Sequence, residues 1–155
     1  MDKALILRKL RAQLEADMLR QRDANKRASA GATDSEGRAE TKWDTCSLES
    51  SYLARGHAQQ FEKLAADIRQ LQVLTAEDFK DRPIGTGALV EVTFGDDSKL
   101  FYLLQCGGGI KLRVDERDLT IITPQTPVGK ALRGKKRGDK FSFREGQSGK
   151  IVSVE

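Results

Sequence analysis

The sequence predicts an α+β protein in which an N-terminal antiparallel coiled-coil hairpin is followed by an antiparallel sheet. Two observations support this prediction: a shift in glycine and proline content along the chain, and a change in apolar periodicity. Residues 1–78 hold three of the 14 glycines and no proline, whereas residues 79–155 hold the other glycines and all three prolines. Since glycine and proline weaken helices and mark turns, we expect a helical domain over 1–78 and a strand-rich domain over 79–155.

Apolar residues recur every three or four positions along two segments of the first domain, as in the seam of a coiled coil. The first stripe consists of Leu7, Leu10, Leu14 and Met18. The second consists of Trp43, Tyr52, His57, Phe61, Leu64, Ile68 and Leu71. The stripes align in an antiparallel hairpin when paired residue numbers add up to 78, as for Leu14 with Leu64. This register places the tip of the hairpin at residues 31–44.

The sequence pattern of residues 79–155 predicts five short strands and one short helix, which indicates a small α+β domain. The expected strands cover residues 88–94, 99–105, 119–123, 139–144 and 150–154, with the helix at 127–134. The segment Gly95-Asp-Asp-Ser98 separates the first two strands and is a hairpin signal.

Composition indicates a soluble protein of the cytoplasm. Charged residues make up 32% of the 155 residues, the net charge is +4, and no run of about 18 apolar residues could cross a membrane. The two cysteines, Cys46 and Cys106, lack metal or redox spacing, so we expect them to be reduced. The single histidine, His57, argues against a zinc site or a histidine-based catalytic triad.

Four carboxylates gather at the predicted tip of the hairpin: Asp34, Glu36, Glu40 and Asp44. Mg²⁺ usually takes one or two protein carboxylates and leaves its other positions open. Such a cluster would bind the ion weakly unless a partner completed the coordination shell. The alternative is a solvated loop whose acids favour the positive end of the following helix.

Two groups of basic residues could hold a phosphate backbone. The first is on the outer part of the first helix and comprises Arg20, Arg22, Lys26 and Arg27. Asp17 and Asp23 dilute it, so an ordinary helix surface is the alternative. The second is the run Arg133-Gly-Lys-Lys-Arg-Gly-Asp139, which lacks interleaved aromatic residues and also reads as a β-turn surface.

The segment Thr126-Pro-Val-Gly-Lys-Ala-Leu-Arg-Gly-Lys-Lys-Arg-Gly-Asp139 resembles the C-terminal signature of the Gre family of bacterial transcription elongation factors. That signature runs Ser-Pro-apolar-small-basic-Ala-Leu-x-Gly-Lys, then Gly-Asp and a strand; Thr126 stands where serine is usual. The segment 52–60 is similar to the start of the family's second helix. The resemblance covers nearly the whole chain and implies an FKBP-like domain over 79–155 behind the coiled-coil hairpin of 1–78.

The resemblance also implies a function. In this family the globular domain docks at the mouth of the secondary channel of bacterial RNA polymerase, and the coiled coil enters the channel. Acids at the tip then help to hold the second Mg²⁺ of the polymerase, which activates water for cleavage of backtracked RNA. The chain would thus be no enzyme by itself and would bind no cofactor tightly. A hairpin that folds back on itself permits a monomer, which is the oligomeric state we expect.

The same resemblance gives roles to individual residues of this sequence. The tip acids Asp34, Glu36, Glu40 and Asp44 would share the Mg²⁺ with the polymerase. The basic residues Arg20, Arg22, Lys26 and Arg27 would meet the 3′ end of the nascent RNA. Docking to the polymerase would fall to Thr126, Pro127, Val128 and Lys130.

Three alternatives remain open. The family's two tip acids stand seven and four residues before a tyrosine, but counting back from Tyr52 gives Thr45 and Leu48, with Asp44 and Glu49 as the nearest acids. This departure favours a regulator that occupies the channel without stimulating cleavage, as DksA does.

An FKBP-like domain could instead be a peptidyl-prolyl isomerase, which needs an aromatic-lined pocket. The basic second domain also allows a module that binds nucleic acid on its own.

Overall fold

The computed structural model describes residues 1–33, 46–74, 76–144 and 147–155. These residues form two compact units, which are described separately. The helical unit spans Ala12–Arg69, and the sheet unit combines Met1–Arg11 with Gln70–Glu155. The first turns of the N-terminal helix therefore belong to the sheet unit, although the apolar stripe runs through them without a break.

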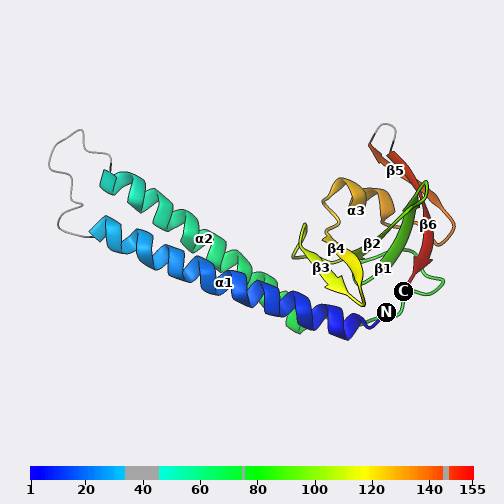
Figure 1. Ribbon diagram of the computed structural model, residues 1–155, viewed down its shortest axis with the longest axis horizontal. Helices are drawn as coiled ribbons and strands as arrows, with labels where there is room; N and C mark the ends of the chain where they lie inside the picture. Colours follow the sequence, from blue (N-terminus) through cyan, green and yellow to red (C-terminus); the bar gives the residue numbers. More distant parts are fainter. Residues whose placement is uncertain (34–45, 75, 145–146) are drawn as a thin grey trace. The chain divides into compact units, whose positions relative to one another are not determined.

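The helical unit contains most of two long helices, α1 (Lys3–Thr33) and α2 (Cys46–Gln72), which run antiparallel (Figure 1). Leu14, Leu64 and Ile68 are buried, as their places in the two stripes predict. Tyr52 is 66% exposed, so its assignment to the stripe was wrong. Tyr52 lies five positions before His57, and at about 100° per residue this turns Tyr52 roughly 140° away from the seam. Trp43 lies outside the described residues.

Within the described part of the sheet unit, six strands form one sheet in the order β3-β4-β2-β1-β6-β5 (Figure 1). Every neighbouring pair is antiparallel except β2 and β4, which are parallel. The strands are β1 (Leu89–Phe94), β2 (Asp97–Leu103), β3 (Lys111–Val114), β4 (Arg117–Ile122), β5 (Lys140–Arg144) and β6 (Gln147–Val154).

The sheet corrects the sequence-based prediction in two respects: β3 was missed, and the sheet is not wholly antiparallel. The strand β3 has four residues and joins β4 through Asp115 and Glu116, whose φ angles are 49° and 62°. Such left-handed turns usually contain glycine or asparagine, so this hairpin left no signal in the sequence. The connection from β2 through β3 brings the chain back along β4 in the direction of β2, which makes that pair parallel.

One face of the sheet packs against the short helix α3 (Pro127–Leu132), which lies next to β5. Alternate residues of the strands point to this face and form the main core, together with Phe79, Ile84 and Leu132. The strand residues of this core are Val90, Val92, Phe101, Leu103, Ile122, Phe141, Ile151 and Val154. This burial is the main stabilising contribution to the unit and it holds α3 in place.

The opposite face is also buried around β2, through the other set of alternate residues. Leu100, Tyr102, Leu119 and Ile121 are among them. The first turns of α1 lie on this side: Leu10 is fully buried, and the Lys9 Nζ donates to the Arg113 carbonyl at 2.9 Å. A Cβ at Gly107 would lie 3.3 Å from the Leu10 side chain, so the loop Gly107-Gly-Gly109 allows the helix to approach closely.

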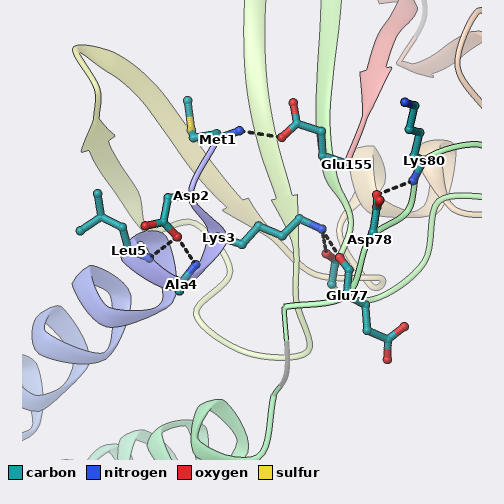
Figure 2. Close-up of polar contacts among 10 residues, drawn as sticks. Met1, Asp2, Lys3, Ala4, Leu5, Glu77, Asp78, Lys80 and Glu155 are labelled. Carbon is teal, nitrogen blue, oxygen red and sulfur yellow. Dashed lines mark hydrogen bonds and ion pairs between the residues drawn. The ribbon is translucent and has the colours of Figure 1, made fainter.

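Lys3 ties the start of α1 to the rest of the sheet unit (Figure 2). Its ammonium donates to the carbonyl oxygens of Glu77 and Gly87, the latter at 3.0 Å, and lies 5.2 Å from the centre of the Phe79 ring. Asp2 caps the helix, since its Oδ1 accepts from the N–H groups of Ala4 and Leu5. The start of α1 is thus held by hydrogen bonds between the side chains of Asp2 and Lys3 and backbone groups.

Among the residues that the structure describes, no helix combines the length and the apolar character that crossing a membrane requires.

Candidate functional site

The helix α3 begins with a complete N-terminal cap, formed by the first residue of the Gre-like motif. Thr126 has extended backbone angles (φ −67°, ψ 151°), and its Oγ1 accepts a hydrogen bond from the Gly129 N–H at 3.1 Å. The same hydroxyl donates to the Thr123 carbonyl at 2.7 Å. Pro127 occupies the first helical turn, where a backbone N–H has no partner inside the helix. The hydroxyl-proline pair at the start of the motif is therefore explained by capping.

The small residue of the motif, Gly129, is required by backbone packing. A Cβ at this position would lie 2.0 Å from the Thr123 carbonyl oxygen, well below any real contact. Leu132, in the last turn of the helix, is fully buried in the core. The motif thus contains residues that build α3 and anchor it on the sheet.

The four predicted docking residues differ in exposure. Pro127 and Lys130 have exposed side chains. Val128 is half-buried and packs against the core, while Thr126 is half-buried and uses its hydroxyl in the cap. Of the four, Pro127 and Lys130 are therefore the residues available to a partner. Thr126 and Val128 stabilise the helix that carries them, through the cap and through packing on the core.

The basic run after α3 is a rigid pair of turns, in agreement with the turn interpretation of its glycines. The Gly134 N–H donates to the Ile84 carbonyl at 2.9 Å, and the Ile84 N–H donates to the Lys135 carbonyl at 2.8 Å. On the other side, the Gly138 N–H donates to the Ile151 carbonyl at 2.8 Å. The backbone of residues 133–139 is therefore fastened both to the segment before β1 and to β6.

The four basic residues of the outer α1 do not form one cluster. At about 100° per residue, Arg20 and Arg27 lie on one side of the helix, whereas Arg22 and Lys26 lie on another. All four side chains are exposed. Arg20 pairs with Asp17, and Arg22 pairs with Asp23 at 3.4 Å. The four residues are close together in the sequence, but the helix places them in two pairs, one on either side of the apolar seam.

His57 lies in the seam of the helical unit, as its place in the stripe predicts. Its Nδ1 lies 2.9 Å from the Oε1 of Gln21 on α1. The residue numbers of this pair add up to 78, so the contact confirms the predicted register at this level of the hairpin. Sequence reasoning did not find Gln21, although the register itself points to it.

The tip acids Asp34, Glu36, Glu40 and Asp44 lie outside the described residues. Among the residues that the structure does describe, no group of three or more His, Cys, Asp or Glu side chains could hold a metal ion. The Mg²⁺ site at the tip therefore stays a prediction.

An aromatic-lined cavity of about 420 Å³ opens beside β1 and β2, on the face that carries α3. Phe94, Phe101 and Phe143 line it, and the Lys99 Nζ lies 5.4 Å from the centre of the Phe94 ring. Phe141 and Phe101 are buried, as strand alternation predicts, but Phe94 and Phe143 are half-buried. Tyr102 points to the opposite face and contributes nothing to this cavity.

No protein-family model and no curated protein sequence matches the chain. Among solved structures, it is similar to the transcription factor Gfh1, with 16% identity over 93% of this chain and 92% of that chain, at a TM-score of 0.39. Similar values hold for the GreA factor homolog 1 (Gfh1) of Thermus thermophilus (20%, 94% and 94%, TM-score 0.38) and for Thermus aquaticus Gfh1 (18%, 92% and 92%, TM-score 0.39). Likeness at this level does not assign a function, which has to be argued from the site itself.

Proposed function

We propose that this chain is a transcription factor that binds bacterial RNA polymerase through α3 and acts on the polymerase active centre through the acidic segment between α1 and α2. The observation that carries the proposal is that some residues of the motif have a structural role in the fold and others do not. Capping explains Thr126, close packing explains Gly129, and core burial explains Leu132. The start of the helix also explains Pro127, but the fold gives no reason for the exposed Lys130. Contact with a partner supplies that reason.

The helical unit suits the second half of the proposal. In the part of its seam that the structure describes, the buried Leu14 and Leu64 lie beside a polar layer formed by Gln21 and His57. The pairs Arg20 with Arg27 and Arg22 with Lys26 flank the seam on two sides. A hairpin that enters a channel containing RNA can use these two pairs of basic residues to contact RNA phosphates on either side of the hairpin.

The tip acids would act only in the complex. Asp34, Glu36, Glu40 and Asp44 would supply carboxylate oxygens to a Mg²⁺ whose other ligands come from the polymerase. Whether the outcome is stimulated cleavage of backtracked RNA or occupation of the channel without cleavage depends on their register. Incubating a stalled, backtracked polymerase complex with the protein separates the two: shortened RNA supports stimulation, and unchanged RNA supports the channel-occupying regulator.

Docking is tested with Pro127→Asp, which places a charge on the exposed start of α3 while leaving the cap in place. We expect association with RNA polymerase to be lost while the circular dichroism spectrum is retained. Lys111→Asp, an exposed change on β3 in the same unit, is the matched control and should bind normally. Unchanged affinity of the Pro127 variant would overturn the docking assignment.

The tip is tested separately by neutralising Asp34, Glu36 and Glu40 together with the corresponding amides. We expect polymerase binding to persist and any effect on the active centre to disappear. If binding is lost instead, the tip is a docking element and the proposed role at the active centre is wrong.

The aromatic cavity keeps a peptidyl-prolyl isomerase as the second candidate, because three phenylalanines line it. Asp97, Lys99 and Gln147 share the same lining, so the cavity is open to polar groups and poorly suited to hold a proline ring dry. We expect no acceleration of proline isomerisation in a standard peptide. Activity that falls on Phe101→Ala would make the isomerase the better assignment.

A further inference from the structure

Burial in the seam of the helical unit decreases toward the outer end of the hairpin, where α1 ends and α2 begins. Leu14 and Leu64 are buried. The next apolar pair outward, Met18 and Phe61, is only half-buried. Since apolar burial is the main source of stability in a coiled coil, the stabilisation that each layer contributes falls in the same direction.

The layers farther out contain polar side chains. Gln21 and His57 form the polar layer, in which Nδ1 of His57 lies 2.9 Å from Oε1 of Gln21. One step outward, the same register places Asn25 opposite Leu53. Leu53 precedes His57 by four positions and so lies about 40° from it around α2, yet Leu53 is 56% exposed. This outermost layer therefore adds little apolar burial.

Gly56 weakens α2 at the same level. It lies inside the helix, next to His57, where glycine loses more conformational entropy than alanine. A glycine in a helix can be required by the close approach of another segment. Among the residues that the structure describes, however, no atom lies within 4 Å of a Cβ built at this position. Packing therefore gives no reason for Gly56, and the helix is intrinsically less stable there.

We infer that the outer turns of the helical unit open as one cooperative unit while the inner turns stay folded. The outer turns are residues 22–27 of α1 and 52–56 of α2, and the inner turns are residues 14–21 and 57–68. Local opening takes place where few apolar contacts hold a segment. A partner that contacts the outer turns would order them, so its binding would be coupled to their closure. This opening is a property of the protein alone and does not depend on the proposed function.

Native-state hydrogen exchange of the full chain, at a series of urea concentrations below the unfolding transition, measures the opening. The amides of residues 52–56 report on the outer turns, and those of residues 61–68 report on the inner turns. Gly56→Ala strengthens α2 within the outer turns, whereas Lys63→Gly weakens it at an exposed position of the inner turns. A substitution changes the free energy of an opening only if its residue unfolds in that opening, so the two variants locate the boundary.

We expect the amides of residues 52–56 to be about tenfold or more less protected than those of residues 61–68. They should share one urea dependence, which is weaker than that of the inner amides because less surface is exposed. Gly56→Ala should raise the protection of the outer amides about fivefold. Lys63→Gly should leave the outer amides unchanged and reduce the protection of the inner ones.

Three results would overturn the inference. Equal protection along α2 would show that the helical unit opens as a whole, and so would an outer loss in Lys63→Gly that matches the inner loss. Protection that rises residue by residue from 52 to 56, without a common urea dependence, would show simple fraying of a helix end.

Asn25→Leu tests the layer argument by a second route, because it gives Leu53 an apolar partner across the seam. We expect protection of the outer amides to rise about fivefold or more. Asp23→Leu, an exposed change on the far side of α1, is the matched control and should leave this protection unchanged. Equal effects of the two variants would mean that Leu53 does not face Asn25. None of these measurements includes polymerase, so failure of the proposed function would leave them unaffected.

Discussion

The Nδ1 atom of His57 lies 2.9 Å from the Oε1 atom of Gln21, and this contact joins α1 to α2 within the helical unit. The pair is half-buried, whereas Leu14 and Leu64, farther from the tip, are almost fully buried. A polar layer in a narrow apolar seam fixes the register of a coiled coil, because a shift of one turn leaves both groups without partners.

We therefore predict energetic coupling between Gln21 and His57. In a double-mutant cycle, Gln21→Ala and His57→Ala should each destabilise the protein, and the double variant should lose less than the sum of the two by about 0.5–1 kcal/mol. Urea unfolding followed by circular dichroism measures each free energy. Gln60→Ala, an exposed change on α2, should show no coupling to Gln21→Ala. Additivity of the Gln21 and His57 variants would show that the contact does not stabilise the hairpin.

The sequence was a good guide where a repeated pattern carried the information. The helical stripe predicted burial of Leu14, Leu64 and Ile68, and its register agrees with the Gln21–His57 contact, which the sequence analysis did not name. It failed at Tyr52, where a single aromatic residue was added to the stripe although its angular position lies off the seam. A helical repeat is established by apolar residues over several turns, so a single residue added to the stripe is weak evidence that its side chain is buried.

The candidate site could be predicted only in part, for a related reason. The motif located α3, but side-chain roles within it depend on contacts that are distant in sequence. A side chain is excluded at Gly129 because its Cβ would collide with the Thr123 carbonyl oxygen. The turns of residues 133–139 are held by backbone hydrogen bonds to Ile84 and Ile151. The pairing of Lys140 with Lys150 follows from strand register, which no local pattern in the sequence indicates.

The cap of α3 gives a graded prediction. Thr126→Ser should be nearly neutral because the hydroxyl is kept, and Thr126→Ala should reduce the free energy of unfolding by about 1 kcal/mol. Gly129→Ala should cost more, about 3 kcal/mol, because its Cβ would collide with backbone that cannot move without disturbing the cap. Thermal unfolding of the three variants checks the order. Equal effects of Thr126→Ala and Thr126→Ser would show that the cap is not what stabilises the helix.

Tyr102 carries a fully buried hydroxyl that has no hydrogen-bond partner within the part of the chain that the structure describes. An unsatisfied buried polar group costs free energy, so Tyr102→Phe should raise the free energy of unfolding by about 1 kcal/mol. Tyr52→Phe, at an exposed position, is the matched control and should change little.

The Tyr102 substitution should also change the response to alkaline pH. Burial raises the pKa of Tyr102 to about 12, above its ordinary value of 10.0. Above pH 10 the unfolded chain therefore releases this proton before the folded chain does, and the wild-type protein loses stability as the pH rises. Tyr102→Phe removes this loss, so its advantage should grow above pH 10. An advantage that shrinks there would contradict the assigned burial.

The Lys3 ammonium predicts the opposite slope in the alkaline range. Desolvation by burial lowers the pKa of Lys3 below its ordinary value of 10.5, and the nearby carboxylates of Asp78, Glu155 and Glu77 oppose this shift. Between the lowered pKa and 10.5 the unfolded chain holds the Lys3 proton more firmly than the folded chain, so the contribution of this residue to stability rises with pH. Lys3→Met removes the titration together with the hydrogen bonds to Glu77 and Gly87.

We expect Lys3→Met to be destabilising by about 1–2 kcal/mol at neutral pH, since two backbone carbonyls lose their donor. Its deficit relative to the wild-type protein should then widen as the pH rises toward 10.5, when the wild-type protein no longer has to bury a charged lysine. Chemical unfolding at a series of pH values gives this difference directly. Lys80→Met, which removes an exposed ammonium from the same region, is the control for the general effect of charge. A deficit that narrows at high pH would mean that Lys3 is stabilised as a cation in the folded state, by Asp78 and Glu155 rather than by the carbonyl oxygens.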